Sequence, residues 1–160
     1  MTDAGQPLTH LDEAGHARMV DVSAKDVSAR QARATGRVLL SGEAIAALRA
    51  GRLPKGDALA VARIAGIQGA KRTPDLVPLC HPIALHGVSV DLEVGDDAVA
   101  ITATVRTADR TGVEMEALTS VTVAALALID MIKAVDPAAV ISDVRVEEKT
   151  GGKTGSWRRP

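Results

Sequence analysis

The 160-residue sequence contains no phenylalanine, no tyrosine and a single tryptophan. Stacking of bases on aromatic side chains, the usual way of binding single-stranded nucleic acid, is therefore nearly excluded. The formal net charge of −1 gives no overall field that would attract nucleic acid or an anionic membrane. The core has to be aliphatic and rich in alanine, and small side chains bury less area per residue. We therefore expect an oligomer that buries additional surface.

Cysteine is almost absent too. Cys80 is the only one, so one chain can form neither an internal disulfide nor a paired-cysteine zinc site. His10, His16 and His86 form no cluster with the spacing of metal ligands, and we predict no metal site. The beginning of the sequence lacks the basic-then-apolar pattern of a signal peptide, and the longest apolar run, Val121–Ile129, is too short to span a membrane. A cytoplasmic location is the resulting expectation.

Composition divides the chain into three parts. Residues 1–15 are polar and aperiodic, and we predict that they form a mobile N-terminal arm. Residues 16–149 contain the periodic segments and the candidate catalytic residues, and their length fits a single domain. Residues 150–160 are rich in glycine and basic, which predicts a flexible tail.

The periodicity of apolar residues predicts an α+β fold with the order β-α-β-β-α-β. Alternation predicts four strands, at Ala34–Ser41, Gly87–Val94, Val99–Thr107 and Ala139–Glu147, and a short extended segment at Met19–Ser23. Three helices are predicted at Gly42–Arg52 with Ser41 as N-cap, at Ala58–Lys71 with Asp57 as N-cap, and at Val113–Val135. Two right-handed crossovers on one antiparallel sheet would give a ferredoxin-like sandwich with the helices on one face.

The stretch from Val61 to Pro82 is the most informative part of the sequence. Its apolar helical pattern is followed by Lys71 and Arg72, two prolines and the tetrapeptide LCHP. Neighbouring side chains in an extended segment point to opposite sides, which disfavours a nucleophilic pair of Cys80 and His81. Cys80 fits the role of a small buried apolar side chain. His81 is the better functional candidate, although a loop histidine is more often structural.

Two carboxylates, Glu114 and Glu116, stand at the start of the long predicted helix. Compensation of the helix dipole would explain one of them. Two carboxylates at this spacing point to the same side only if the segment is still extended there. Such a pair could accept hydrogen bonds from the adjacent donors of a guanine edge.

Asp130 and Lys133 share one face of that helix within the apolar sequence LALIDMIKAV. Charged residues are rarely buried unless they are paired or functional. Two interpretations stay open. The residues form a structural ion pair, or Lys133 is desolvated, its pKa is lowered, and it exchanges protons near neutral pH while Asp130 positions it.

Two further basic segments favour an anionic ligand. Lys55 lies just before a predicted helix N-terminus, where an anion would meet both an ammonium group and the helix dipole. The sequence GGKTG at Gly151–Gly155 imitates a phosphate-binding P-loop, but Glu147 stands where that motif needs glycine, and no helix can follow so close to the end. A basic tail that closes over phosphates stays open as an interpretation.

Seven segments, taken together and in this order, carry a resemblance to a known family: MVDVSAK (Met19–Lys25), KGD (Lys55–Asp57), ARIAGIQGAKRT (Ala62–Thr73), LVPLCHPI (Leu76–Ile83), RTGVEMEALT (Arg110–Thr119), DMIKAV (Asp130–Val135) and KTGGKTG (Lys149–Gly155). The chain is similar to the cyclic pyranopterin monophosphate synthases, the C-protein family of molybdenum cofactor biosynthesis, over about Leu8 to Trp157. Arg110 and Pro74 depart from the family pattern, both conservatively.

The resemblance implies a lyase that converts 3′,8-cyclo-7,8-dihydro-GTP into cyclic pyranopterin monophosphate and diphosphate. It also implies the ferredoxin-like fold and a hexamer, a trimer of dimers, with sites at the dimer interface. Residues carried over as catalytic are Lys55, Asp130 and Lys133. Those carried over as substrate-binding are Leu79, Cys80, His81, Glu114, Met115, Glu116 and Lys149, with Asp21, Lys25, Lys71 and Arg72 less securely placed. The sequence requires no cofactor, and Mg²⁺ on the substrate's triphosphate is left open.

Other classes of protein remain to be weighed against the enzyme. A non-catalytic, nucleotide-binding regulatory module of ferredoxin-like fold would need the anion-binding cations but not the pair of Asp130 and Lys133. Full binding without turnover would identify it. An RNA-binding module of similar topology is disfavoured by the lack of aromatic residues and by the net charge.

Overall fold

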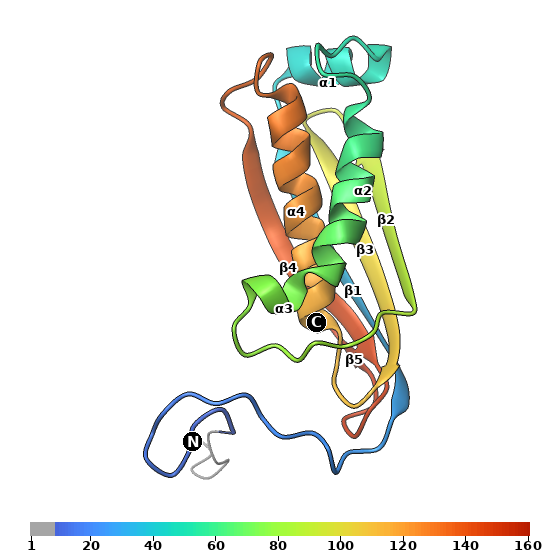
Figure 1. Ribbon diagram of the computed structural model, residues 1–160. Coiled ribbons are helices and arrows are strands. Elements are labelled where there is room, and N and C mark those ends of the chain that lie inside the picture. Colours follow the sequence, from blue (N-terminus) through green and yellow to red (C-terminus); the bar gives the residue numbers. More distant parts are fainter. Residues whose placement is uncertain (1–8) are drawn as a thin grey trace.

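A five-stranded antiparallel sheet with helices against one face forms the computed structural model, which describes residues 9–160 (Figure 1). The sheet has the order β2-β3-β1-β4-β5. The elements follow one another as β1 Ser28–Leu39, α1 Gly42–Ala50, α2 Ala58–Lys71, α3 Thr73–Leu76, β2 Gly87–Val94, β3 Ala98–Asp109, α4 Glu114–Ile132, β4 Val140–Thr150 and β5 Trp157–Arg158. The predicted α+β class is confirmed, and the helices of the first crossover are separate, as predicted.

Local signals account for the helix boundaries. The Ser41 side chain accepts a hydrogen bond from the Ala44 backbone N–H at 3.2 Å, and Asp57 accepts one from Ala60 at 3.0 Å, so both predicted N-caps are present. Helix α1 ends at Gly51, whose φ of 63° lies in the left-handed region that glycine adopts readily.

The predicted strand Gly87–Val94 matches β2 at both ends, whereas the other three predicted strands are longer in the structure and β5 was not predicted. Strand β1 begins at Ser28 rather than at Ala34, because it pairs with β3 over its whole length although Arg30 and Arg33 obscure the apolar alternation. Residues 19–23 form no strand. The single turn α3 and the two-residue β5 were not predicted, because each depends on tertiary contacts rather than on periodicity.

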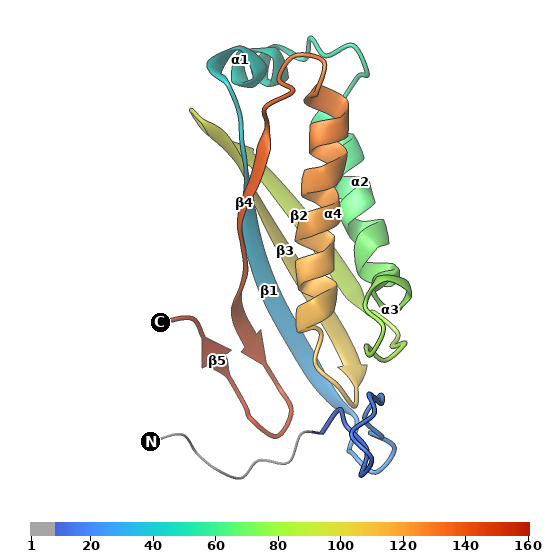
Figure 2. The ribbon, with the colours of Figure 1, turned by 90° about the vertical axis from the view of Figure 1, so that its left-hand side faces the viewer.

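Helices α2 and α4 lie side by side across the sheet (Figures 1 and 2). Glycine allows this approach. A Cβ atom placed on Gly66 would lie 3.0 Å from the Ser120 carbonyl oxygen, and one on Gly69 would lie 2.8 Å from the Val123 Cβ. A larger residue at either position would force the two helices apart.

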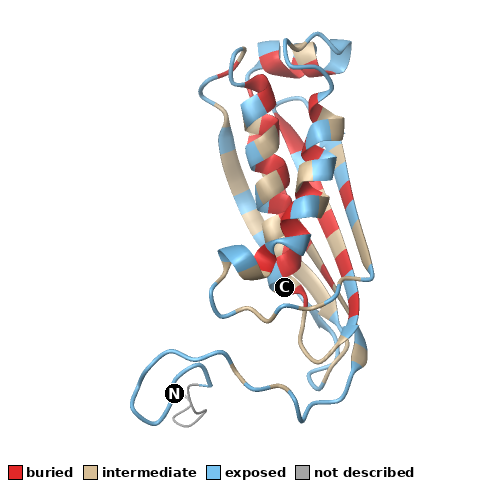
Figure 3. Cartoon of the chain, in the orientation of Figure 1, coloured by how far each residue is buried: buried red, intermediate tan, exposed pale blue. Residues whose placement is uncertain are grey.

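Helix α4 is the core helix of the fold. Its length and mean hydropathy of 1.7 would suffice for a membrane span. This was not predicted from the sequence, because only uninterrupted apolar runs such as Val121–Ile129 were considered. Half of that stretch is buried within this fold, including Val121, Ala124 and Leu128, while Leu126 is 61% exposed. Buried and exposed positions alternate along the helix (Figure 3). The apolar character of α4 is thus used mainly for packing on the sheet and on α2.

The segment before β1 and the hairpin of β4 and β5 lie toward the same end of the sheet (Figure 2). Residues 1–8 of the predicted mobile arm lie outside the described residues, and the rest of the arm forms a turn closed by a bridge between Leu11 and Ala17. Beyond β4, Gly151 and Gly152 have φ values of 92° and 76°, and the chain returns along β4 as β5. The mobility of the arm and of the tail stays a prediction.

We expect Gly69→Ala to lower the free energy of unfolding by up to about 2 kcal/mol. Overpacking against Val123 should destabilise the fold by about 1–3 kcal/mol, while the gain in helix propensity is about 1 kcal/mol. Gly42→Ala, at the start of α1 with open space around its Cβ position, is the matched control and should unfold at the same urea concentration or a higher one. Equal urea midpoints for the two variants would contradict a tight contact between α2 and α4.

Candidate active site

A pocket of about 380 Å³ opens where α4 begins, between the N-terminal segment and the loop that contains LCHP. Its walls bring together residues that are far apart in the sequence. Seven of the residues singled out from the sequence line it: Lys25, Leu79, Cys80, His81, Glu114, Met115 and Glu116. The fold thus assembles most of the predicted substrate-binding residues in one place.

The turn between β3 and α4 delivers Glu114 to this pocket. A Cβ atom on Gly112 would lie 2.0 Å from a Glu114 carboxylate oxygen, so a side chain at this position would displace that carboxylate. Glu114 Oε1 accepts a hydrogen bond from Lys149 Nζ at 2.7 Å, which links α4 to β4. Because Glu114 is already helical, the condition for parallel carboxylates is not met, and the side chains of Glu114 and Glu116 diverge by about 200° around the axis.

Glu116 is the most deeply buried charged residue of the pocket, with 4% of its surface exposed. Burial raises the pKa of its carboxyl group above the ordinary value, and the neighbouring charge of Glu114 adds to the rise. The pocket therefore pairs a carboxyl group that takes up a proton easily with a carboxylate compensated by Lys149.

The LCHP loop contributes a neutral thiol and a held imidazole. Burial raises the pKa of the Cys80 thiol, and the charge of Glu116 raises it further, so the pocket does not activate a thiolate nucleophile. Cys80 is half-buried rather than fully buried as predicted. His81 Nε2 lies 2.5 Å from the Val20 carbonyl oxygen, so this residue ties the N-terminal segment to the loop.

A second cavity, of about 580 Å³, adjoins the pocket and shares Lys25 with it. Arg30 and Lys153 also line it, and Asp26 is its one acidic residue among those described. Arg30 donates to the carbonyl oxygens of Asp109 and Arg110 at 3.0 and 3.3 Å, and no carboxylate within residues 9–160 pairs with it. Sequence reasoning missed Arg30 and passed over Lys153, because nothing in the local pattern separates them from surface cations.

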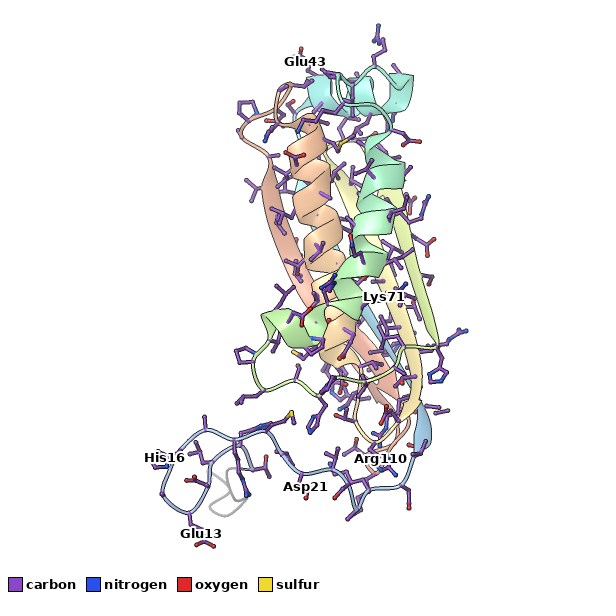
Figure 4. The ribbon with its side chains drawn as sticks, in the orientation of Figure 1. Glu13, His16, Asp21, Glu43, Lys71 and Arg110 are labelled. Carbon is purple, nitrogen blue, oxygen red and sulfur yellow. The ribbon has the colours of Figure 1, made fainter. Side chains whose placement is uncertain are left out.

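The less securely placed residues lie around the pocket rather than in it. Asp21 lines an adjoining shallow cavity together with His81, and the Ser23 N–H, which donates to its carboxylate at 2.9 Å, lowers the pKa of Asp21. Lys71 and Arg72 are exposed at the C-terminal end of α2, and Arg72 pairs with Asp75 at 3.4 Å (Figure 4). Neither of these two cations lines the pocket.

The predicted catalytic residues gather elsewhere, at the far end of α4. Asp130 accepts hydrogen bonds from Lys133 at 2.8 Å and from Lys55 at 2.9 Å. These contacts lower the pKa of Asp130 to about 2, with the Lys133 hydrogen bond as the largest cause. The side chains of Asp130 and Lys133 are 54% and 59% exposed, so the interpretation of Lys133 as a desolvated group is wrong for the single chain. Met131 and Ile132 beside them are buried, so Asp130 and Lys133 lie on the solvent-exposed side of this helix end, and their ion pair is solvated.

The two groups of residues cannot meet on one small molecule within one chain. Glu114 and Asp130 stand about 24 Å apart along α4, because an α-helix rises about 1.5 Å per residue. Figure 4 marks the two ends of the molecule: Asp21 and Arg110 lie at the end that holds the pocket, and Glu43 of α1 lies at the opposite end.

These features define an α+β protein with a pocket that contains two carboxylates, a thiol and an imidazole at one end and an exposed Lys–Asp–Lys cluster at the other. The chain belongs to the MoaC family, whose family model matches residues 19–152. A protein of Streptomyces coelicolor named cyclic pyranopterin monophosphate synthase is 69% identical over 98% of this chain and 92% of its own length. Proteins with the same name from Streptomyces avermitilis and a Nocardioides species are 72% and 65% identical, over 95% and 100% of this chain and 89% and 100% of their own lengths.

We expect the Asp130 carboxyl group to titrate at about pH 2 in the intact protein. Because this pKa is depressed, the ion pairs should stabilise the fold above the ordinary value of 3.8, and that contribution should be lost as the pH falls toward 2. Lys133→Met should move the pKa of Asp130 upward, toward 3.8. Carboxyl ¹³C shifts followed by NMR would measure both, with Asp75 as an internal reference; identical titration curves in the two proteins would contradict the pairing.

Proposed function

We infer that this chain is a cyclic pyranopterin monophosphate synthase, a lyase of molybdenum cofactor biosynthesis. The observation that carries this conclusion is identity of 65% to 72% to proteins of that name over nearly the whole chain. The reaction converts 3′,8-cyclo-7,8-dihydro-GTP into cyclic pyranopterin monophosphate and releases diphosphate. It opens and rebuilds rings, which needs proton transfer, and it closes a cyclic phosphate, which needs stabilisation of developing negative charge.

We assign the guanine-derived ring system to the pocket at the start of α4. Its edge carries adjacent hydrogen-bond donors, and Glu116 is a buried acceptor with little access to water. Leu79 and Met115, which are 36% and 40% exposed, offer apolar surface to the ring faces. His81 holds the N-terminal segment against the same pocket, which favours its role in closing the site around the substrate.

We assign the triphosphate to the cations next to that pocket. Lys149 lies beside Glu114, and Lys25 borders both the pocket and the cavity with Arg30 and Lys153. A triphosphate is a polyanion near neutral pH, so it requires several such cations. Mg²⁺ is proposed only as a counter-ion that the substrate brings with it.

We propose that Lys133 and Lys55 carry the proton transfers and that Asp130 orients them. The carboxylate lies between the two ammonium groups, with one oxygen bonded to each. It therefore fixes both nitrogens while it balances part of their charge. Coverage by another subunit would desolvate a lysine that is exposed in the single chain, and desolvation lowers a lysine pKa toward neutrality.

The separation of about 24 Å leads us to propose a site shared between two chains. One chain would supply the pocket and its partner the Lys–Asp–Lys cluster, in the dimers of a hexamer. Large exposed apolar side chains, among them Ile64 and Leu76, favour such assembly. The strand order β2-β3-β1-β4 supports a ferredoxin-like core, and a cytoplasmic location fits an enzyme that uses a GTP-derived substrate.

Lys133→Arg tests the function and the role of Lys133 together. Arginine keeps the positive charge but does not deprotonate, so the variant should bind the cyclised nucleotide normally and lose turnover by on the order of 10²-fold or more. Single-turnover rates and the substrate Kd measure the two effects separately. Near-normal turnover would make Lys133 a phosphate anchor only, and binding without turnover in the unmodified protein would favour the regulatory module instead.

Subunit mixing tests the shared site. Glu116→Gln and Lys133→Ala should each abolish most of the activity when present in every chain. After the two inactive proteins are unfolded and refolded together, some interfaces would combine an intact pocket with an intact Lys–Asp–Lys cluster. We expect about a quarter of the activity to return if assembly is random and each dimer has two sites. Mixing Lys133→Ala with Lys55→Ala is the control, because both changes lie in the same cluster and no intact site can form; recovery in that control, or none in the first mixture, would contradict a site built from two chains.

A further inference from the structure

Strand β4 changes its side-chain alternation just before Lys149. Val146 pairs with Ala34 and Lys149 pairs with Ala32, and both alanines are fully buried beneath the helices. Val146 and Lys149 therefore both point toward the helix side of the sheet. Residues three positions apart in a regular strand point to opposite faces. The stretch of β4 between Val146 and Lys149 therefore contains one extra residue relative to β1. The register shift between Arg33 and Ala34 places that residue at Glu147, which has no partner in β1.

This bulge decides which face of the sheet receives Lys149. Without the extra residue in the pairing, a chain with Val146 on the helix side would place Lys149 on the opposite face. Its ammonium group could then not reach Glu114, which lies on α4 at 2.7 Å in the structure. The contact between Lys149 and the pocket thus depends on an irregularity in β4.

A network of hydrogen bonds holds the bulge from the open face of the sheet. The Glu147 carboxylate accepts from Thr35 Oγ1 at 2.6 Å and from Arg145 Nε at 2.7 Å. Only 18% of the Glu147 side chain is exposed. These two bonds, the one from Thr35 first, lower the pKa of Glu147, so the carboxylate is charged throughout the neutral range.

The C-terminal segment supports the same point of the chain. The Arg159 backbone N–H donates to the Glu147 carbonyl oxygen at 2.8 Å, and Arg159 Nε donates to the Val146 carbonyl oxygen at 2.8 Å. Directly before it, β5 pairs with β4 at Glu148 and Lys149. Carbonyl groups left without partners by the bulge are therefore satisfied by the returning chain.

We propose that Glu147 is a positioning residue, which together with Arg159 fixes the bulge that presents Lys149 to Glu114 and to the substrate pocket. Glu147 itself lies on the opposite face of the sheet and contacts none of the pocket residues. The role of Lys149 toward substrate rests on the proposed function, whereas the placement of its side chain does not.

The exposure of the Lys149 amine tests the placement without any substrate. Brief labelling with an amine-acetylating reagent, read by mass spectrometry, should modify Lys149 several-fold faster in Glu147→Ala than in the unmodified protein, with Lys71 as the internal reference. Glu148→Ala is the matched control, because Glu148 is the neighbouring carboxylate on the same face, is 26% exposed and pairs with Arg33 and Arg158. Its labelling of Lys149 should stay within twofold of the unmodified protein. Thr35→Val, which removes only one of the hydrogen bonds to Glu147, should also increase the rate at which Lys149 is labelled, as Glu147→Ala does.

Equal labelling of Lys149 in the unmodified protein, Glu147→Ala and Thr35→Val would overturn the proposal, and so would an equal rise in the Glu147 and Glu148 variants. Turnover gives the second readout. Glu147→Ala should lower kcat/KM about tenfold in the unmodified background and less than twofold in a Lys149→Met background, because both changes then remove the same contact. Independent, multiplying losses would show that Glu147 does not act through Lys149. If the unmodified protein had no turnover, the proposed function would be wrong. The labelling result would still test whether Glu147 positions the Lys149 side chain.

Discussion

The packing of one straight helix on the sheet determines where everything else in this protein can be. Helix α4 contacts β1, β3 and β4 on one side and α2 on another. Its buried positions are mostly small or β-branched side chains, and glycine on α2 permits the close approach. A helix packed in this way is stiff, so the groups at its two ends keep a fixed separation. The distance between the two sites is consequently set by the length of α4.

The charges at the two ends of α4 are balanced differently. At the pocket, Lys149 compensates Glu114, while Glu116 is buried in a form that favours a proton. At the other end, two ammonium groups share one carboxylate, which leaves a net positive charge. Excess positive charge for a polyanion is therefore found in the far cluster, at Lys25 and at Arg30, although the two ends of one α4 are too far apart to act on the same small molecule.

Much of this architecture could be predicted from local pattern. Ser41 and Asp57 are N-cap residues that predict the starts of two helices. The strict alternation of apolar and polar residues predicts both ends of β2 correctly. The predictions that failed concern features that depend on tertiary structure. Asp130 and Lys133 sit in an apolar sequence, which suggested burial, but they lie on the solvent-exposed side of the helix end, while Met131 and Ile132 take the buried positions there. The position of the Arg30 side chain could not be predicted either, because it depends on the pairing of β1 with β3, which brings the Asp109 and Arg110 carbonyl groups beside it.

Sequence motifs also place residues in a site without saying what form they take there. Cys80 belongs to the LCHP tetrapeptide and lines the pocket, yet desolvation and the nearby carboxylate keep its sulfur protonated. The thiolate is the form of cysteine that reacts with oxidants and alkylating agents. Cys80 should therefore react with oxidants and alkylating agents more slowly than an exposed thiol of ordinary pKa.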